Sequence, residues 1–173
     1  MSLATDSIQI EPLESHHDRS SFSCGNESLD RYIHEQASQD VRRNTARVFV
    51  AVMPDRPEHI LGFFTLSAAT VVAADLPPAM EKRLPRHPIP AALIGRLAVD
   101  LAAAGQGLGS VLLADAVKKT KVAAETVAMS VIVVDPIDDG AQGFYSAFGF
   151  QFLRGPQRRM FMAIHGGAAK SVQ

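Results

Sequence analysis

The feature that most constrains this chain is a run of alternating glycines between an apolar segment and an amphipathic one. After the apolar stretch that ends at Val99-Asp100, the chain reads Gly105-Gln106-Gly107-Leu108-Gly109, and an amphipathic run begins at Ser110. Glycine adopts left-handed backbone dihedrals without strain, so the N–H groups of such a loop can converge on one point. A helix that starts directly afterwards adds its own unpaired N–H groups and its positive dipole end. The sequence therefore predicts a cradle for a pyrophosphate group.

Two familiar phosphate-binding loops do not match this spacing. A Walker loop needs Gly-Lys-Ser/Thr at the helix start, whereas Ser110 follows Gly109 directly. A Rossmann fingerprint needs Gly-x-Gly-x-x-Gly, and the third glycine here comes one residue too early. A third pattern, Arg/Gln-x-x-Gly-x-Gly/Ala, is the acetyl-CoA loop of the GNAT superfamily of N-acetyltransferases, and residues 104–109 resemble it. The departure is Ala104, which replaces the family's Arg or Gln and removes one side-chain contact to phosphate. By itself, the loop is equally compatible with an ordinary glycine-rich turn.

A second motif lies downstream, where residues 141–150 resemble the A-x-x-F-Y-x-x-x-G-F ending of GNAT domains. Phe144 and Phe148 are spaced i, i+4, which predicts an aromatic, core-facing side of a helix. Gly149 suits the left-handed residue that ends such a helix. Tyr145 lies one residue off that side, which predicts a hydroxyl free for a cofactor cleft. The alternative is a tyrosine of the core.

Further motifs are similar to the toxin branch of GNAT enzymes, which acetylates aminoacyl-tRNA. They run in the same order along the chain, from about residue 22 to residue 164. They are Phe22-Ser23-Cys24-Gly25 with Leu29-Asp30, Leu61-Gly62-Phe63-Phe64-Thr65-Leu66-Ser67, the proline-rich Leu84–Pro90, and Ile94-Gly95-Arg96-Leu97-Ala98-Val99-Asp100.

Composition agrees with one globular domain. The chain has 173 residues, 47% hydrophobic and 20% charged, with a formal net charge of −1, so attraction to nucleic acid must come from local patches. One cysteine excludes an internal disulfide, and no Cys/His cluster has zinc spacing, so no metal is predicted. No apolar run approaches the length of a membrane helix, and we expect a cytoplasmic protein.

The hydrophobic patterns predict alternating strands and helices. We expect one domain over residues 1–173, with a core of about 8–164 and a tail at 165–173. Asn26 is a predicted N-cap for a helix through about Arg42. A second helix is expected over 108–124, and no strand over 74–92, which holds five prolines. Strands are expected at 8–13, 47–53, 60–67, 96–100, 129–135, 150–153 and 159–164.

The resemblance implies a fold class and a set of site residues. The implied fold is α/β, a mixed sheet of six to seven strands flanked by helices, with a splayed central strand that forms the acetyl-CoA cleft. Tyr145 is the expected general acid for the departing CoA sulfur, and the backbone N–H around Val99 would polarise the thioester carbonyl. The expected cofactor-binding residues are Leu97, Ala98, Val99, Ala104, Gly105, Gln106, Gly107, Leu108, Gly109, Ser110 and Phe144.

No general base is evident in the sequence. A lysine amine, with an ordinary pKa near 10.4, needs a base, whereas an α-amine, with a pKa of about 7.7–8.0, is partly neutral already. The missing base favours an α-amine acceptor. A water chain to Asp100 or Asp135 stays open as an alternative.

Basic clusters would supply an electrostatic path for tRNA, because Lys and Arg bind phosphates without reading sequence. The alternative is that each cluster is only a solvated face. The residues predicted to bind tRNA are Arg42, Arg43, Lys82, Arg83 and Arg86. A further cluster, Arg154, Arg158 and Arg159, flanks the last predicted hairpin.

These observations predict an acetyl-CoA-dependent N-acetyltransferase that acts as a toxin by acetylating aminoacyl-tRNA. The first alternative is a protein, peptide or small-metabolite N-acetyltransferase, and the second is a catalytically silent acyl-CoA-binding or partner-binding module. The resemblance also implies a ribbon-helix-helix antitoxin as partner and leaves a homodimer open.

Overall fold

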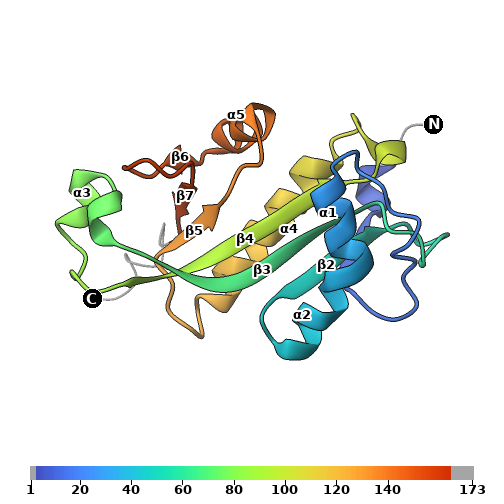
Figure 1. Ribbon diagram of the computed structural model, residues 1–173, viewed down its shortest axis with the longest axis horizontal. Helices are drawn as coiled ribbons and strands as arrows, with labels where there is room; N and C mark the ends of the chain where they lie inside the picture. Colours follow the sequence, from blue (N-terminus) through green and yellow to red (C-terminus); the bar gives the residue numbers. More distant parts are fainter. Residues whose placement is uncertain (1–2, 165–173) are drawn as a thin grey trace. The chain divides into compact units, whose positions relative to one another are not determined.

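A computed structural model describes residues 3–164, which form an α/β fold with a seven-stranded mixed sheet (Figure 1). The strands are β1 (Gln9–Pro12), β2 (Arg47–Val52), β3 (Gly62–Val71), β4 (Ile89–Val99), β5 (Val131–Val134), β6 (Gln151–Phe152) and β7 (Met160–Ala163). The helices are α1 (Glu27–Arg31), α2 (Ala37–Arg43), α3 (Pro78–Glu81), α4 (Leu108–Ala123) and α5 (Asp139–Phe148). The strand order is β1-β2-β3-β4-β5-β7-β6, with β4 and β5 parallel and joined through α4. The predicted fold class, a mixed sheet of six to seven strands flanked by helices, is confirmed.

The chain divides into two compact units. The first comprises Met1–Ser67 and Gly95–Lys118, and the second comprises Ala68–Ile94 and Lys119–Gln173. β3, β4 and α4 contribute residues to both units. The predicted tail at 165–173 lies outside the described residues. Within residues 3–164, none of the helices combines the length and the apolar character that crossing a membrane requires.

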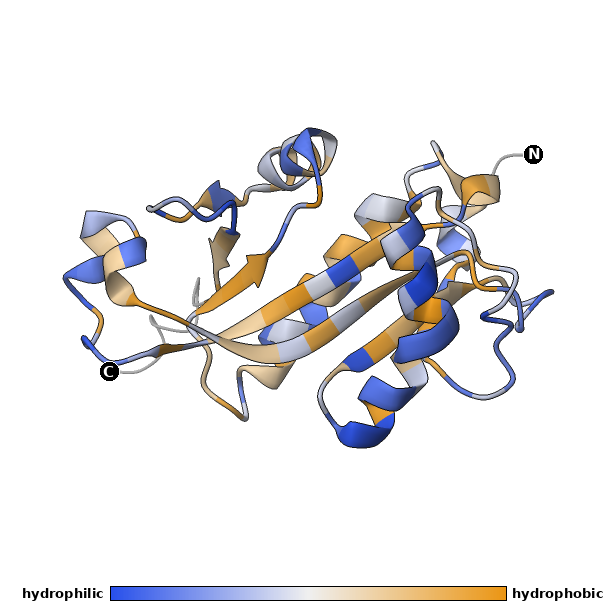
Figure 2. Cartoon of the chain, in the orientation of Figure 1, coloured by the Kyte–Doolittle hydropathy of each residue, from blue (hydrophilic) through white to orange (hydrophobic). Residues whose placement is uncertain are grey.

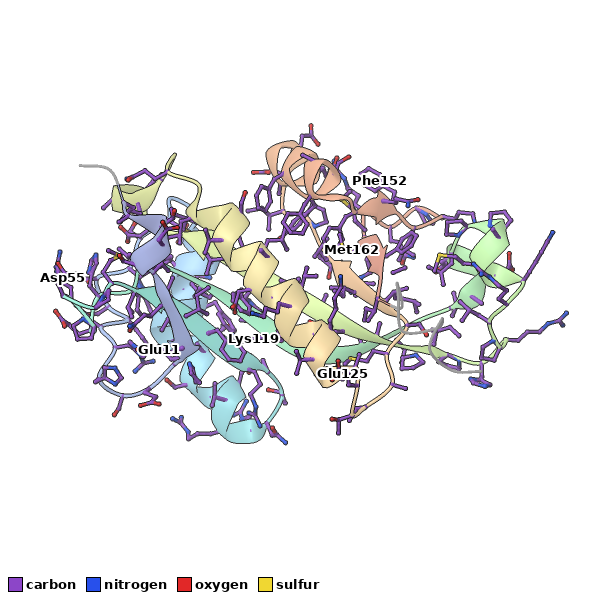
Figure 3. The ribbon with its side chains drawn as sticks, turned by 180° about the vertical axis from the view of Figure 1, so that it is seen from behind. Glu11, Asp55, Lys119, Glu125, Phe152 and Met162 are labelled. Atoms are coloured by element: carbon purple, nitrogen blue, oxygen red, sulfur yellow. The ribbon has the colours of Figure 1, made fainter. Side chains whose placement is uncertain are left out.

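In the first unit, helices cover both faces of the strands. Figure 1 shows α1 and α2 on one face, and Figure 3, seen from behind, shows α4 on the other. The predicted N-cap is confirmed, because the Asn26 side chain accepts a hydrogen bond from the Leu29 N–H at 3.0 Å. Leu29, Ile33 and Ala37 are buried in one cluster with the valines of β2. This face of the sheet is therefore closed by the first helical segment.

The predicted helix from the Asn26 cap through about Arg42 is confirmed in its extent, but its middle turn is not α-helical. A π-helical turn, Tyr32–Gln36, separates α1 from α2. Leu29, Tyr32, Ile33 and Ala37 are buried, which is the i, i+3, i+4, i+8 spacing of an ordinary amphipathic helix. Periodicity alone does not reveal such a turn, because the buried positions before and after it still fit an α-helix.

In the second unit, the expected strand-free segment 74–92 is partly wrong, because β4 begins at Ile89. Ile89 and Ala91 are buried, whereas Pro90 is exposed and its carbonyl oxygen accepts the Ser130 N–H at 2.9 Å. Proline has no N–H to donate, but it can serve a strand as an acceptor. β5 is buried at all four positions, as its continuous apolar run predicts, and Figure 2 shows it hydrophobic along its length.

Candidate active site

The glycine loop of the first unit has the backbone that the sequence predicts. Gly105 and Gly107 have φ angles of +76° and +84°, and a Cβ added to either would meet no heavy atom within 4 Å. α4 begins at Leu108, and the Val111 N–H donates to the Gly107 carbonyl oxygen at 3.3 Å. The N–H groups of the first α4 residues therefore lack partners inside the helix. Open space beside two left-handed glycines and a helix N-terminus fits a pyrophosphate group.

Three other residues of this loop differ from the simple expectation. Gly109 is the second residue of α4 and has no positive φ, so it does not take the left-handed conformation. The side chain of Gln106 accepts a hydrogen bond from the Leu3 N–H. Ala104 is exposed and offers no polar side chain. The cradle therefore consists of backbone groups, with no side-chain donor from position 104.

The loop is anchored at its start by Asp100, which is buried. One carboxylate oxygen accepts the Ser23 N–H and the other accepts the Ala102 N–H, both at 3.0 Å. The Asp100 N–H in turn donates to the Leu61 carbonyl oxygen at 2.8 Å. Both oxygens of this carboxylate thus hold backbone N–H groups, which compensates for its burial. Asp100 is a positioning residue of the loop.

β4, the strand that leads to Asp100, extends beyond the end of its neighbour β5. The last β4–β5 pair joins Ile94 to Val134, where β5 ends, whereas β4 continues to Val99. Leu97, Ala98 and Val99 lie on this continuation. The Ala98 side chain is buried in the core cluster of the first unit, so only its backbone can serve a ligand. Beyond Ile94, β4 therefore continues without a β5 partner, and the predicted splaying of this strand stays a prediction.

Gly62 allows β3, β4 and α4 to approach each other at this point. A Cβ on Gly62 would lie 2.8 Å from Leu112 Cδ1 and 2.9 Å from the Ala98 carbonyl oxygen. We expect Gly62→Ala to lower the free energy of unfolding by about 1–3 kcal/mol, because a backbone carbonyl cannot move aside cheaply. Urea unfolding measures this. Gly143→Ala, at an open position in α5, is the control and should stabilise by about 0.5–1 kcal/mol; equal effects would contradict the assignment.

In the second unit, the predicted general acid Tyr145 is the buried residue of α5. It is 7% exposed, and its ring makes edge contacts with Phe144 and Phe150 at centroid distances of 5.3 and 5.6 Å. Burial, and then the charge of Asp135, raise the pKa of Tyr145 to about 12. No buried side-chain oxygen or nitrogen within residues 3–164 lacks a hydrogen-bond partner, and no partner is assigned to this hydroxyl. The hydroxyl therefore keeps access to solvent while its ring is buried.

The predicted orientation of α5 is wrong in one respect. Phe144 and Phe148, expected to face the core, are half-buried, whereas Tyr145 takes the buried position. The helix is short and is capped by Asp138, which accepts the Ala141 N–H at 2.8 Å. Its end at Gly149, with φ +119°, is as predicted. Phe144 stays a prediction for cofactor contact.

Asp135, the second carboxylate considered as a relay, is also engaged. Its two oxygens accept from Arg159 Nε and Nη2 at 2.8 and 2.9 Å, a bidentate pair. Arg154 pairs with Glu81 at 2.7 Å, and Arg158 pairs with Asp139 at 2.6 Å. The expected phosphate-binding role of this arginine cluster is therefore not supported, because each of its members has a carboxylate partner.

The residues predicted to bind tRNA are all exposed. Arg42 and Arg43 lie in the last turn of α2, in the first unit. Lys82, Arg83 and Arg86 follow α3, in the second unit, and Arg83 donates to the Ala79 carbonyl oxygen at 3.3 Å. Within the described part of the chain, none of these five has a carboxylate partner, which separates them from the cluster at 154–159.

One group of possible metal ligands, Glu11, His16 and His17, comes together in the first unit. His17 Nδ1 accepts the Glu14 N–H at 2.9 Å, so Nε2 carries the proton and donates to Glu11 at 2.7 Å. A metal ion would need the lone pair of the nitrogen that holds this proton. We therefore assign His17 a structural role.

The chain belongs to the acetyltransferase (GNAT) family, whose family model matches residues 10–150. A curated relative is the tRNA-acetylating toxin of Mycobacterium tuberculosis (strain ATCC 25618 / H37Rv). It is 37% identical over 134 residues, which cover 78% of each chain.

Several solved structures of toxins are similar. AtaT complexed with acetyl-methionyl-tRNAfMet has a TM-score of 0.87 at 26% identity, covering 94% of this chain and 98% of that one. AtaTR bound with acetyl-CoA has a TM-score of 0.80 at 28% identity, with coverage of 92% and 95%. A mutant AtaT bound to the C-terminus of the antitoxin AtaR has a TM-score of 0.79 at 26% identity, with coverage of 97% and 100%.

Proposed function

We propose that this protein acetylates the α-amino group of aminoacyl-tRNA with acetyl-CoA as donor, and so acts as a toxin that inhibits translation. The similarity to a tRNA-acetylating toxin and to AtaT complexed with acetyl-methionyl-tRNAfMet supports the proposal. The structural observation that carries it is the glycine loop before α4, where Gly105 and Gly107 have left-handed backbones and open space for a pyrophosphate. Asp100 and Asp135, the two carboxylates considered as a relay, both have structural hydrogen-bond partners. An acceptor whose amine is already partly neutral needs neither as a base. The place of action is the cytoplasm, where charged tRNA is used.

In this proposal the residues of the chain have separate tasks. The N–H groups of the glycine loop and of the first turn of α4 hold the pyrophosphate of acetyl-CoA, which supplies the activated acetyl group. The Val99 N–H donates a hydrogen bond to the carbonyl oxygen of the thioester as negative charge develops on it. The Tyr145 hydroxyl donates a proton to the departing sulfur. Side-chain carboxylates take no part.

Two further parts of the proposal concern organisation. We take residues 1–173 as one catalytic domain, because the family match at 10–150 draws on both units. We also propose that a ribbon-helix-helix antitoxin holds the protein inactive, since the similar AtaT was solved bound to the C-terminus of the antitoxin AtaR.

The direct test uses labelled acetyl-CoA with charged tRNA, with uncharged tRNA and with a peptide that has a free N-terminus. We expect label only on charged tRNA, released by mild base as an N-acetyl amino acid. Label on the peptide would favour a peptide acetyltransferase instead. Binding of acetyl-CoA without any turnover would favour a silent binding module.

Charge reversal in the loop after α3 is expected to weaken tRNA binding. The double variant Arg83→Glu with Arg86→Glu should lower the salt dependence of log K by about 2, because each lost phosphate contact removes about 0.9 from the slope. Affinity for acetyl-CoA should be unchanged. Lys118→Glu with Lys121→Glu, two exposed lysines of α4, changes the net charge equally and should leave tRNA affinity intact. Equal losses in both double variants would point to net charge alone.

A further inference from the structure

Arg96, a residue of β4 in the first unit, has its guanidinium stacked on the ring of Tyr32. The Cζ atom lies 3.7 Å from the ring centroid. Tyr32 is 1% exposed, and its hydroxyl donates to Asp40 Oδ2 at 2.9 Å. Burial, and then the hydrogen bond to Asp40, raise the pKa of Tyr32, so the ring stays neutral. The contact is therefore a cation held over an aromatic face.

The guanidinium of Arg96 has no acidic partner in the part of the chain that the structure describes, and no hydrogen bond to its donors is assigned there. Arg96 is nevertheless half-buried. Its situation differs from that of Arg154, Arg158 and Arg159, each of which pairs with a carboxylate. A half-buried arginine without a partner is uncommon, since removing charge from water is costly. The Tyr32 ring covers one face of the guanidinium. The N–H donors that lie in the plane of the guanidinium, along its edge, are left unused.

The backbone around Arg96 fixes where this edge can point. The Arg96 N–H donates to the hydroxyl of the buried Thr65 at 3.0 Å, in place of a backbone carbonyl. Ala98, two residues on and thus on the same face of the strand, packs in the cluster that contains Tyr32. Arg96 is also three residues before Val99, whose N–H we assign to the reacting carbonyl. Arg96 thus has a rigid aromatic support, a fixed backbone and planar guanidinium donors without a partner in the described part of the chain. Together these features are typical of a side chain that binds an oxyanion.

We propose that Arg96 binds a phosphate oxyanion of the acceptor tRNA, with Tyr32 as the platform that sets the plane of its guanidinium. The inference rests on the proposed function, because it takes a nucleic acid as acceptor. The phosphates of acetyl-CoA carry the same chemistry, but the glycine loop already provides backbone donors for them. The tRNA acceptor carries phosphodiesters as well. Of the half-buried cations described above, Arg96 is the one whose donors are free to bind them.

The test compares three variants with the wild-type protein. Arg96→Met keeps the approximate length of the side chain and removes its charge, whereas Arg96→Lys keeps the charge and removes the planar set of N–H donors. Tyr32→Phe removes the hydroxyl and keeps the aromatic ring. We expect Arg96→Met to raise the KM for aminoacyl-tRNA about tenfold or more, the loss of one charged hydrogen-bonded contact. Arg96→Lys should be intermediate, and Tyr32→Phe, which keeps the stacking face, should raise the KM less than either Arg96 variant. Affinity for acetyl-CoA, by calorimetry, should not change.

Arg31→Met is the matched control, since Arg31 is exposed, belongs to the neighbouring helix turn and pairs with Glu27 at 3.0 Å. It removes the same charge and should leave the KM unchanged. An Arg96→Met protein with wild-type KM and tRNA affinity overturns the proposal. A loss of acetyl-CoA affinity in Arg96→Met also overturns it, because the guanidinium would then serve the donor.

Binding of uncharged, fluorescently labelled tRNA separates this inference from the proposed function. If the wild-type protein binds tRNA through Arg96 but does not acetylate charged tRNA, the proposed function fails and the inference stands. If it acetylates charged tRNA and Arg96→Met changes neither KM nor tRNA binding, the inference alone fails. A wild-type protein that binds no tRNA overturns both.

Discussion

Tyr145→Phe is expected to lower kcat by about 10²–10⁴-fold, the usual contribution of a positioned general acid. The change removes one proton donor and almost no volume, and the edge contacts of the ring with Phe144 and Phe150 persist. Affinity for acetyl-CoA should therefore stay at the wild-type value. Single-turnover kinetics at saturating substrates, together with calorimetry, measure the two quantities separately.

Tyr32→Phe is the natural control, because Tyr32 and Tyr145 are the two tyrosines of the chain. It deletes a hydroxyl that donates to Asp40 and should leave kcat near wild type. Full activity in Tyr145→Phe would make Tyr145 a packing residue.

The raised pKa of Tyr145 also fixes the sign of its pH dependence. With a pKa of about 12, the hydroxyl keeps its proton across the working range and loses it only as the pH approaches that value. The rate should therefore rise as an acceptor amine with a pKa of about 7.7–8.0 loses its proton, and it should not fall before about pH 10. A falling limb near neutral pH would assign the proton donor to another group.

The second large effect is expected at the glycine loop. Gly107→Val should raise the Kd for acetyl-CoA about 10- to 100-fold, because a Cβ at φ +84° strains the backbone and displaces donors to a charged phosphate. Gly105→Val, at φ +76°, should act in the same direction. Calorimetric titration with acetyl-CoA provides the measurement.

Gly155→Val offers a matched control for strain. Gly155 also has a left-handed φ, +103°, with open space around its missing Cβ, but it lies between β6 and β7 in the second unit. Its replacement should cost comparable stability and leave the Kd unchanged. If Gly107→Val and Gly155→Val bind acetyl-CoA equally well, the loop does not hold the phosphates.

Local signals in the sequence predicted the parts of the fold that depend on local chemistry. Asn26 capped its helix, Gly149 ended α5, and the glycine loop adopted left-handed dihedrals at Gly105 and Gly107, because each effect acts within a few residues. The apolar run of β5 was equally clear, since a strand buried on both faces tolerates no polar position.

The errors arose where tertiary contacts decide. Pro90 was expected outside any strand, yet the carbonyl it offers to Ser130 was enough for β4 to include it. In α5, the i, i+4 spacing of two phenylalanines predicted that their side chains would face the core. In the structure, Tyr145 is the buried residue instead. The role of Arg159 depends on Asp135, 24 positions away, and the role of Arg96 depends on Tyr32, 64 positions away. No rule of sequence spacing reveals such partners.

Asp100 ties together segments that lie 77 positions apart in the sequence, because its carboxylate holds the Ser23 N–H as well as the turn before the glycine loop. We therefore expect the two segments to change together among related chains. Among related chains, loss of the carboxylate at position 100 should be accompanied by a change of sequence around positions 22–24. Likewise, a change around positions 22–24 should be accompanied by loss of that carboxylate. The segment at 22–24 would then be inherited together with the cofactor loop, although it need never touch the cofactor.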